Sequence, residues 1–116
     1  MKGDPGLIAW VAEALEPVGT VSGRAMMGVT ALYCDGAIFA IVDGDALWLK
    51  SDAESAAEWD AAGAERFSFV GKDGRTVSNS YRRAPGDVHD DPDAMRRWGA
   101  LAVAAGRRKS MPKRKR

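Results

Sequence analysis

The stretch VSGRAMMGVTALYCDGAIFAIVDGDALWLK, from Val21 to Lys50, decides the fold. Its apolar residues recur with a period near two between glycine-containing turns, which is typical of short antiparallel strands. Asp35-Gly36 and Asp43-Gly44-Asp45 tolerate the positive φ angles of tight hairpin turns. We therefore predict four strands joined as a meander. The segment AIFAIV (37–42) is apolar on both faces, so we place it centrally in the sheet, covered by a helix on at least one side.

Helices are expected on both sides of this strand-rich segment. Asp4-Pro5 and Asp91-Pro92 each combine a good N-cap with a proline at the first helical position, so each predicts the start of a helix. Ser51 and Glu54 have the spacing of a capping box, which predicts another helix over SDAESAAEWDAAG, residues 51–63. Residues 66–70 (RFSFV) and 75–83 (RTVSNSYRR) are predicted as two further strands.

These elements give the order α-ββββ-α-ββ-α and one domain over residues 1–106. Helices packed on one face of an antiparallel sheet satisfy that order, so the expected fold class is α+β, a two-layer sandwich. A chain of 116 residues is long enough to bury one core without disulfides or metal. The apolar residues end at Gly106, and we predict a disordered basic tail over residues 107–116.

Charge divides the chain at the same boundary. The net charge is only +1, yet seven of the last ten residues are Lys or Arg and none of the ten is acidic. Such cations neutralise phosphates and give salt-dependent, sequence-independent attraction to nucleic acid. The tail has no aromatic residue for base stacking, and the acidic remainder of the chain would repel a phosphate backbone. The candidate nucleic-acid contacts are Arg107, Arg108, Lys109, Lys113, Arg114, Lys115 and Arg116.

Cysteine usage and hydropathy bear on the compartment. Cys34 is the single cysteine, so no intramolecular disulfide can form and a reducing compartment is favoured. The N-terminus carries Asp4 and Pro5 where the apolar region of a secretory signal should begin. No apolar run approaches the ~18 residues of a membrane span. We expect a cytoplasmic protein with no membrane partner.

Three spaced motifs in the same region resemble a known family. They are Arg24-Ala25-Met26-Met27-Gly28, Leu32-Tyr33-x-x-Gly36-x-x-Phe39-Ala40, and Leu47-Trp48-Leu49-Lys50-x-Asp52. With Gly63, Phe67, Gly74, Ser78-x-Ser80-Tyr81, Pro85 and Trp98, they are similar to the N-terminal domain of the TfoX (Sxy) regulators of natural competence. The resemblance covers nearly all of residues 5–106, and the spacing agrees throughout. Three departures are Met27, where the family has Phe, Val29-Thr30-Ala31, where the family's glycine-rich run continues, and Asn79, where the family has Met before the Ser-Tyr pair.

The resemblance implies a two-layer α/β sandwich similar to secretion-chaperone-like folds, many of which dimerise, so a homodimer is one expected state. It also implies a regulatory rather than a catalytic role, exercised by a stand-alone N-terminal domain. The working surface expected from it is the strand-and-loop region from Arg24 to Tyr33, together with Tyr81 and exposed parts of the helices. The candidate partner-binding residues are Arg24, Met26, Met27, Gly28, Tyr33 and Tyr81.

Arg24 and Trp10 each have two possible interpretations. Arg24 could bind an anion or a partner's carboxylate through its guanidinium fork, but an ion pair within the chain is the commoner role of such a residue. Trp10 falls off the main apolar face of the first helix, which favours an exposed interface residue. A wider apolar stripe on that helix is the alternative for Trp10.

The chain shows no phosphate-binding loop, nucleophile elbow or zinc-protease motif, so we assign no catalytic residue, metal or cofactor. His89 is interpreted as a solvated imidazole among carboxylates. Asp90 and Asp91 are interpreted as helix-capping residues rather than cation ligands. Cys34 is interpreted as an ordinary strand residue, because Asp35 would raise its pKa.

Three functions remain open. The first is a non-enzymatic interaction module that acts in transcriptional regulation by contacting another protein, such as a DNA-bound activator or polymerase. The second is direct nucleic-acid binding dominated by the basic tail. The third is a small-molecule binder that uses a cleft between the sheet and the helices.

Overall fold

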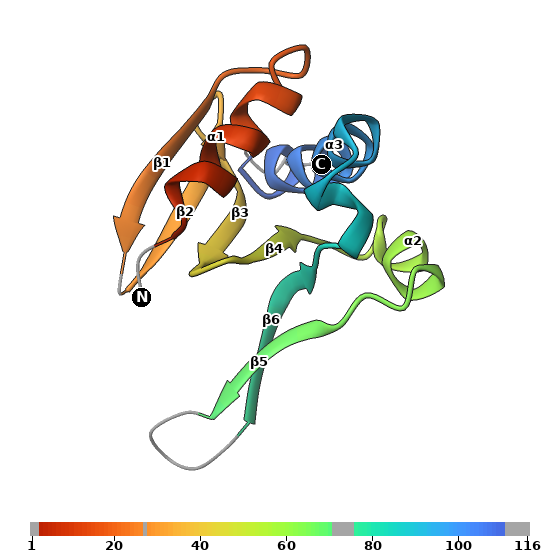
Figure 1. The fold of residues 1–116 in the computed structure, drawn as a ribbon. Coiled ribbons are helices and arrows are strands. Elements are labelled where there is room, and N and C mark those ends of the chain that lie inside the picture. The colour runs from red at the N-terminus through yellow and green to blue at the C-terminus, as the bar shows by residue number, and fades with distance from the viewer. Residues whose placement is uncertain (1–2, 27, 71–75, 111–116) are drawn as a thin grey trace, which may run out of the picture.

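The computed structural model describes residues 3–26, 28–70 and 76–110, and it contains the expected order of elements (Figure 1). The fold is α+β, as predicted, with one short 3-10 helix in the loop before the last helix. The elements are α1 (Pro5–Ala14), β1 (Val21–Met26), β2 (Val29–Cys34), β3 (Ala37–Asp43), β4 (Ala46–Lys50), α2 (Ala56–Ala61), β5 (Arg66–Val70), β6 (Thr76–Arg83), η1 (Gly86–His89) and α3 (Pro92–Ser110).

The strands form one antiparallel six-stranded sheet in the order β1-β2-β3-β4-β6-β5. The β2–β3 turn places Asp35 and Gly36 at φ 51° and 88°, which is the left-handed region that the Asp-Gly pair was expected to supply. The register then shifts between Leu32 and Tyr33, so that Phe39 is an extra residue on β3. This bulge turns the Phe39 side chain into the core, where it is fully buried.

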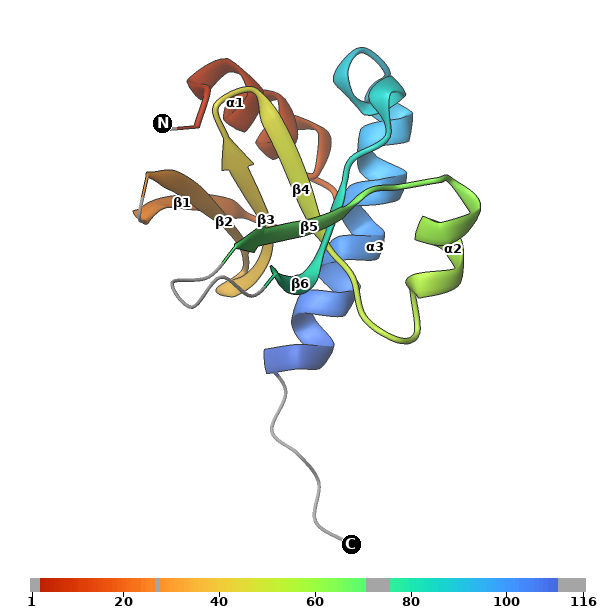
Figure 2. The same ribbon diagram turned by 90° about the horizontal axis from the view of Figure 1, so that it is seen from below.

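One face of the sheet carries the helices and the core. Figures 1 and 2 show α1 and α3 beside each other against the strands, with α2 next to α3. Alternate strand residues, such as Leu47 and Leu49 of β4, point toward these helices. The intervening Trp48 and Lys50 are buried as well, so the burial of β4 does not alternate. The side chains packed in this core include Val11, Leu32, Leu49, Met95 and Ala102.

The tryptophans position the helices. Trp59 of α2 is fully buried and lies 4.8 Å from the Trp98 ring of α3, centroid to centroid, so the two rings join these helices. Trp10 of α1 is half-buried and packed against the core, and its Nε1 donates a hydrogen bond to the Val88 carbonyl at 2.7 Å. The expectation of an exposed interface residue at Trp10 is therefore wrong, because the apolar stripe of α1 is wider than its strict helical face.

The other face of the sheet carries no helix within the described residues (Figure 2). The register sets Tyr33 opposite Ile38, Ile41 opposite Trp48, and Lys50 opposite Tyr81 on this face. Phe67 of β5 reaches across β6 to meet Trp48 edge-on, with 4.9 Å between the ring centroids. The sheet therefore curls toward this side, and its central side chains shield one another.

The helix starts agree with the sequence at two of three places. Asp4 accepts a hydrogen bond from the Gly6 N–H, and Asp91 accepts from the N–H groups of Asp93 and Ala94, so both caps are confirmed. The expected Ser51–Glu54 capping box is wrong. The reciprocal pair is one residue later: Asp52 Oδ1 accepts from the Ser55 N–H, and Ser55 Oγ accepts from the Asp52 N–H.

The last helix is longer than expected. Helix α3 continues to Ser110, so residues 107–110 are helical and the predicted disordered tail from 107 is wrong for these four positions. The reason is electrostatic: basic residues favour the C-terminal turn of a helix, and acidic side chains from neighbouring loops meet them there. Residues 111–116 lie outside the described part of the chain. Among the described helices, none combines the length and apolarity that a membrane crossing requires.

Candidate functional site

Strand β1 forms one edge of the sheet and is the most exposed strand of which all side chains are described. Its residues from Ser22 to Met26 are all exposed. Arg24 and Met26 alternate with Gly23 and Ala25, so they share the helix-free face with Ser22. Met26 is 38% exposed, which is unusual for a large apolar side chain in this protein.

Beside Arg24 the surface is hollowed. A shallow depression of about 390 Å³ opens where β1 meets β2, and the aromatic ring at its wall belongs to Tyr33. Among the described residues no carboxylate lies within ion-pair distance of the Arg24 guanidinium, so the alternative of an internal ion pair is not realised there. We name this feature the β1–β2 hollow; its lining residues are Ser22, Gly23, Arg24, Tyr33 and Gly36.

The remaining candidate partner-binding residues are Met27, Gly28 and Tyr81, and the two that the structure describes do not share one exposed surface. Gly28 begins the turn into β2 with φ 85°, a conformation that favours glycine, and Met27 before it lies outside the described residues. Tyr81 occupies the same sheet face as Tyr33 but is only 7% exposed. Burial raises the pKa of Tyr81, and the nearby Tyr33 hydroxyl raises it further. The structure therefore groups Arg24, Met26 and Tyr33 as an accessible set and places Tyr81 beneath the surface.

Two of the basic residues expected to contact nucleic acid are instead engaged inside the domain. Arg107 Nη2 donates to Asp35 Oδ2 at 3.1 Å, which ties the end of α3 to the β2–β3 turn. Arg108 forms a fork with Asp52, donating from Nε to Oδ2 at 2.6 Å and from Nη2 to Oδ1 at 2.8 Å. Its Nε also lies 2.8 Å from Glu54 Oε2. Lys113, Arg114, Lys115 and Arg116 lie outside the described residues.

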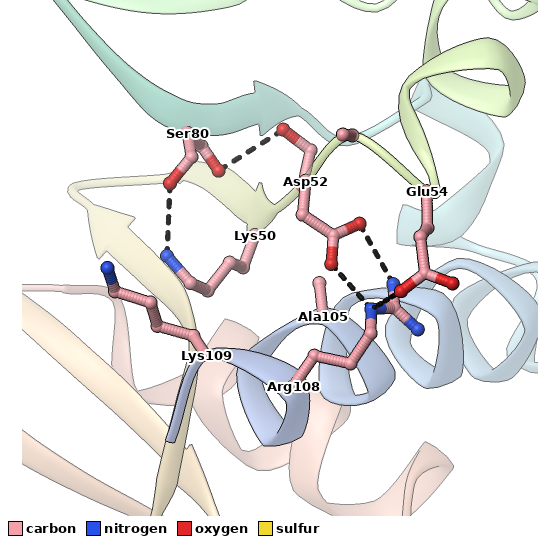
Figure 3. Close-up of a pocket in the computed structure, with 9 residues that line it drawn as sticks. Lys50, Asp52, Glu54, Ser80, Ala105, Arg108 and Lys109 are labelled. Atoms are coloured by element: carbon pink, nitrogen blue, oxygen red, sulfur yellow. Dashed lines mark hydrogen bonds and ion pairs between the residues drawn. The ribbon is translucent and has the colours of Figure 1, made fainter. Parts of the chain in front are cut away.

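A pocket of about 400 Å³ lies beside this arginine fork, between the end of α3, the β4–α2 loop and β6 (Figure 3). Lys50 enters it from the end of β4 and is only 7% exposed. Its Nζ donates to Ser80 Oγ at 3.0 Å and lies 4.7 Å above the centre of the Tyr81 ring. We name it the α3-end pocket; its lining residues are Lys50, Ser51, Asp52, Ala53, Glu54, Ser80, Ala105, Arg108 and Lys109.

The charges of the α3-end pocket perturb one another. The hydrogen bonds from Arg108 lower the pKa of Asp52 from 3.8 to about 2, and Ser55 assists, although partial burial acts in the opposite direction. Burial lowers the pKa of the Lys50 ammonium, and the positive charge of Lys109 lowers it further, while Asp52 raises it. The two carboxylates and Arg108 therefore form one ion-paired group with a net charge of −1, with two lysine ammonium groups on its other side (Figure 3).

The residues considered for catalysis or metal binding have ordinary surroundings. Burial raises the pKa of the Cys34 thiol, as does the charge of Asp35, while Arg107 lowers it. The fully buried Cys34 thus has the raised pKa that Asp35 was expected to cause. His89 is exposed at the end of η1, beside a shallow hollow that it shares with Asp4 and Trp10. Within the described residues, no three His, Cys, Asp or Glu side chains are grouped as a metal site would require.

The sequence reasoning missed the α3-end pocket. Lys50 and Asp52 were noticed only as the end of a motif, and nothing local pairs them with residues almost sixty positions later. The available signal was Lys50 itself, which ends the otherwise apolar strand β4. A lysine is seldom buried without a polar partner, so a lysine in such a strand indicates a polar site nearby.

Comparison with known proteins comes from two directions. A search of curated proteins found no match. The model of the TfoX N-terminal domain matches residues 13–106, from the last turn of α1 to the penultimate turn of α3, which is most of the chain. This match agrees with the motifs that line both the β1–β2 hollow and the α3-end pocket. The chain belongs to the TfoX N-terminal domain family.

Proposed function

We propose that this chain is a non-enzymatic protein-binding module that acts in transcriptional regulation, and that its partner docks at the β1–β2 hollow. The regulatory role follows the resemblance to competence regulators. The docking role rests on one observation: an arginine without an internal ion pair among the described residues shares a hollow with an accessible tyrosine at a sheet edge.

Strand β1 favours a particular kind of partner. Its outer side has no neighbouring strand in the described sheet, so its backbone groups can pair with an added extended segment. Arg24 presents a guanidinium that matches a carboxylate in a two-point hydrogen bond. Met26 and Tyr33 add apolar and aromatic contact area of the kind enriched at interfaces. We infer that the partner contributes an extended acidic segment along β1.

The nucleic-acid alternative loses support at the start of the basic stretch. Arg107 and Arg108 pair with Asp35, Asp52 and Glu54, so phosphate binding by these two residues would compete with existing ion pairs. The acidic body of the chain adds repulsion toward a phosphate backbone. We retain nucleic-acid binding as an outcome that the following experiment can detect.

Site-specific photo-crosslinking tests the proposal in cell extract. A photoreactive amino acid at Ser22, which lines the hollow, is compared with the same amino acid at Ala57, which is exposed on α2. We expect one protein to crosslink from position 22 and not from position 57, and to survive a wash at roughly 0.5 M salt, where phosphate contacts fail. Adding Arg24→Glu should abolish that crosslink because it places a carboxylate against the acidic segment.

The control for this experiment is Arg66→Glu, which makes the same charge change at an exposed position on β5. The crosslink at position 22 should persist with Arg66→Glu. Equal crosslinking from positions 22 and 57, or a crosslink unaffected by Arg24→Glu, would contradict docking at the hollow. Recovery of nucleic acid alone, removed by salt, would favour the alternative function.

A further inference from the structure

The α3-end pocket is lined by three cations, Lys50, Arg108 and Lys109, and by the two carboxylates of Asp52 and Glu54, so its net charge is +1. Asp52 uses both carboxylate oxygens on Arg108, and Glu54 also pairs with Arg108, so both acids of the pocket are engaged with the same guanidinium. Lys50 and Lys109 lie on the other side of the pocket, and their ammonium groups point the same way (Figure 3). The direct partner of Lys50 is a neutral hydroxyl, Ser80 Oγ at 3.0 Å.

Burying an ammonium group without an anionic partner is costly, so an almost fully buried lysine is normally paired. The charge of Lys109 adds to burial in lowering the pKa of Lys50, whereas the carboxylate of Asp52, which is bonded to Arg108, acts in the opposite direction. The π-face of Tyr81, 4.7 Å away, offsets part of this cost. An anion between the two lysines would offset the rest.

The hydrogen-bond donors suit such an anion. A lysine ammonium has three N–H donors, and the bond to Ser80 uses one of those on Lys50. Because Ser80 Oγ accepts from Lys50, its own hydroxyl hydrogen can be donated onward. Lys109 supplies further donors from the last turn of α3. These groups reach the pocket from β4, β6 and α3, so the folded domain brings them together before any ligand binds.

We propose that the α3-end pocket binds a small molecule through a dianionic phosphate monoester held by Lys50, Lys109 and Ser80. The two ammonium groups lie on the side of the pocket away from the arginine fork, so each can pair with one charge of a monoester, which carries close to two negative charges at neutral pH. The phosphodiester of a nucleic-acid backbone carries only one charge per phosphate. The volume of about 400 Å³ has room for the rest of a small molecule beside Ala53 and Ala105. This site is separate from the β1–β2 hollow, so it stands independently of the proposed function.

The test is a nuclear magnetic resonance titration of the full chain, with four probes. These are inorganic phosphate, glucose 6-phosphate, unphosphorylated glucose and dimethyl phosphate, which has one charge. We expect glucose 6-phosphate to shift the backbone amide signals of residues 50, 80 and 109 saturably at millimolar concentration or below, and glucose to leave them unchanged. Dimethyl phosphate should bind at least about tenfold more weakly, because it engages only one of the two charges.

Variants identify the residues responsible. Lys50→Met keeps the apolar stem over Tyr81 and should weaken glucose 6-phosphate binding about tenfold, the loss expected for one charged hydrogen-bond partner. Lys109→Met should do the same, and because Lys109 is exposed this variant keeps the test valid if Lys50→Met unfolds. Arg66→Gln removes one positive charge from β5 and should change the affinity less than twofold.

Three results would overturn the proposal. One is the lack of a saturable shift at residues 50, 80 and 109 with either inorganic phosphate or glucose 6-phosphate. Another is equal affinity for dimethyl phosphate and glucose 6-phosphate, which would remove the dianion argument. The third is a shift of the same amide signals by a short DNA duplex at a lower concentration than glucose 6-phosphate requires. That result would assign the pocket to nucleic acid. Equal binding of inorganic phosphate and glucose 6-phosphate would support the site and locate recognition in the phosphoryl group itself.

Discussion

The β1–β2 hollow and the α3-end pocket each contain an arginine, and the two arginines do opposite things. Arg24 stands on an exposed edge strand with no ion pair among the described residues. Arg108 makes a two-point bond to Asp52 and a further contact with Glu54. The difference shows that a positive charge becomes available to a partner only when the fold leaves it without an internal acid.

The largest change in stability is expected where the end of α3, which carries Arg108, packs against the sheet. A Cβ added to Gly106 would collide with the Ile38 backbone carbonyl, which cannot move without disturbing β3. Gly106→Ala should therefore lower the free energy of unfolding by about 2–3 kcal/mol, although glycine to alanine normally stabilises a helix. Denaturant unfolding measures this value.

The matched control for Gly106→Ala is Gly23→Ala on β1. Its new methyl would lie 3.3 Å from Thr30 Cγ2 and 3.4 Å from Leu32 Cδ2, which are side-chain methyl groups rather than backbone atoms. Because a glycine within a strand is itself unfavourable, Gly23→Ala should change stability by less than about 0.5 kcal/mol. Equal losses at Gly106 and Gly23 would mean that α3 is not held more tightly than the edge strand.

The next effect comes from Asp52, whose carboxylate holds Arg108. Asp52→Ala removes the arginine fork and the hydrogen bonds from Ser55, and should lower the free energy of unfolding by about 2 kcal/mol at neutral pH. The folded-state pKa is depressed to about 2, so this contribution is complete above about pH 4 and is lost as the pH falls through 2. Unfolding of both proteins between pH 2 and 6 should show their difference shrinking at the acid end. A constant difference would contradict the charge-based explanation, and Glu54→Ala, at a 70% exposed side chain, should cost less than about 0.5 kcal/mol.

The smallest effect is expected at the Arg107–Asp35 pair. Both side chains are about half exposed, at 47% and 51%, so water screens their attraction. Arg107→Gln should lower the free energy of unfolding by about 0.5 kcal/mol, and less at high salt. Urea unfolding at low and high ionic strength checks this value. A loss above about 2 kcal/mol would place Arg107, rather than Arg108, as the main connection of the helix end.

The fold was largely predictable because its signals are local. The four strands over residues 21–50, the Asp-Gly turn and the caps at Asp4 and Asp91 depend on neighbours in sequence, and each is confirmed. The capping box beginning at Ser51 was misplaced by one residue, because Asp52 offers the same spacing to Ser55 and Ser51 is used to bond β6. The extent of α3 was not predictable, since the acids that stabilise its basic end lie far away in sequence.

The two candidate sites also differ in how far apart in sequence their residues lie. The motif around Arg24 located the β1–β2 hollow, because adjacent strands of a meander bring their motifs together. The α3-end pocket escaped, since it joins β4, β6 and the end of α3, and the basic residues there looked like a solvated tail. Tyr81 was expected on the partner-binding surface, yet it is only 7% exposed and the Lys50 ammonium lies over its ring.

The central claim is that Arg108 holds the fold while Arg24 is available to a partner. Equilibrium unfolding of Arg24→Gln and Arg108→Gln tests it most directly, because each variant removes one guanidinium. We expect Arg108→Gln to lose about 1–2 kcal/mol of unfolding free energy and Arg24→Gln to lose less than about 0.5 kcal/mol. Equal losses, or a greater loss at Arg24, would contradict this division of roles.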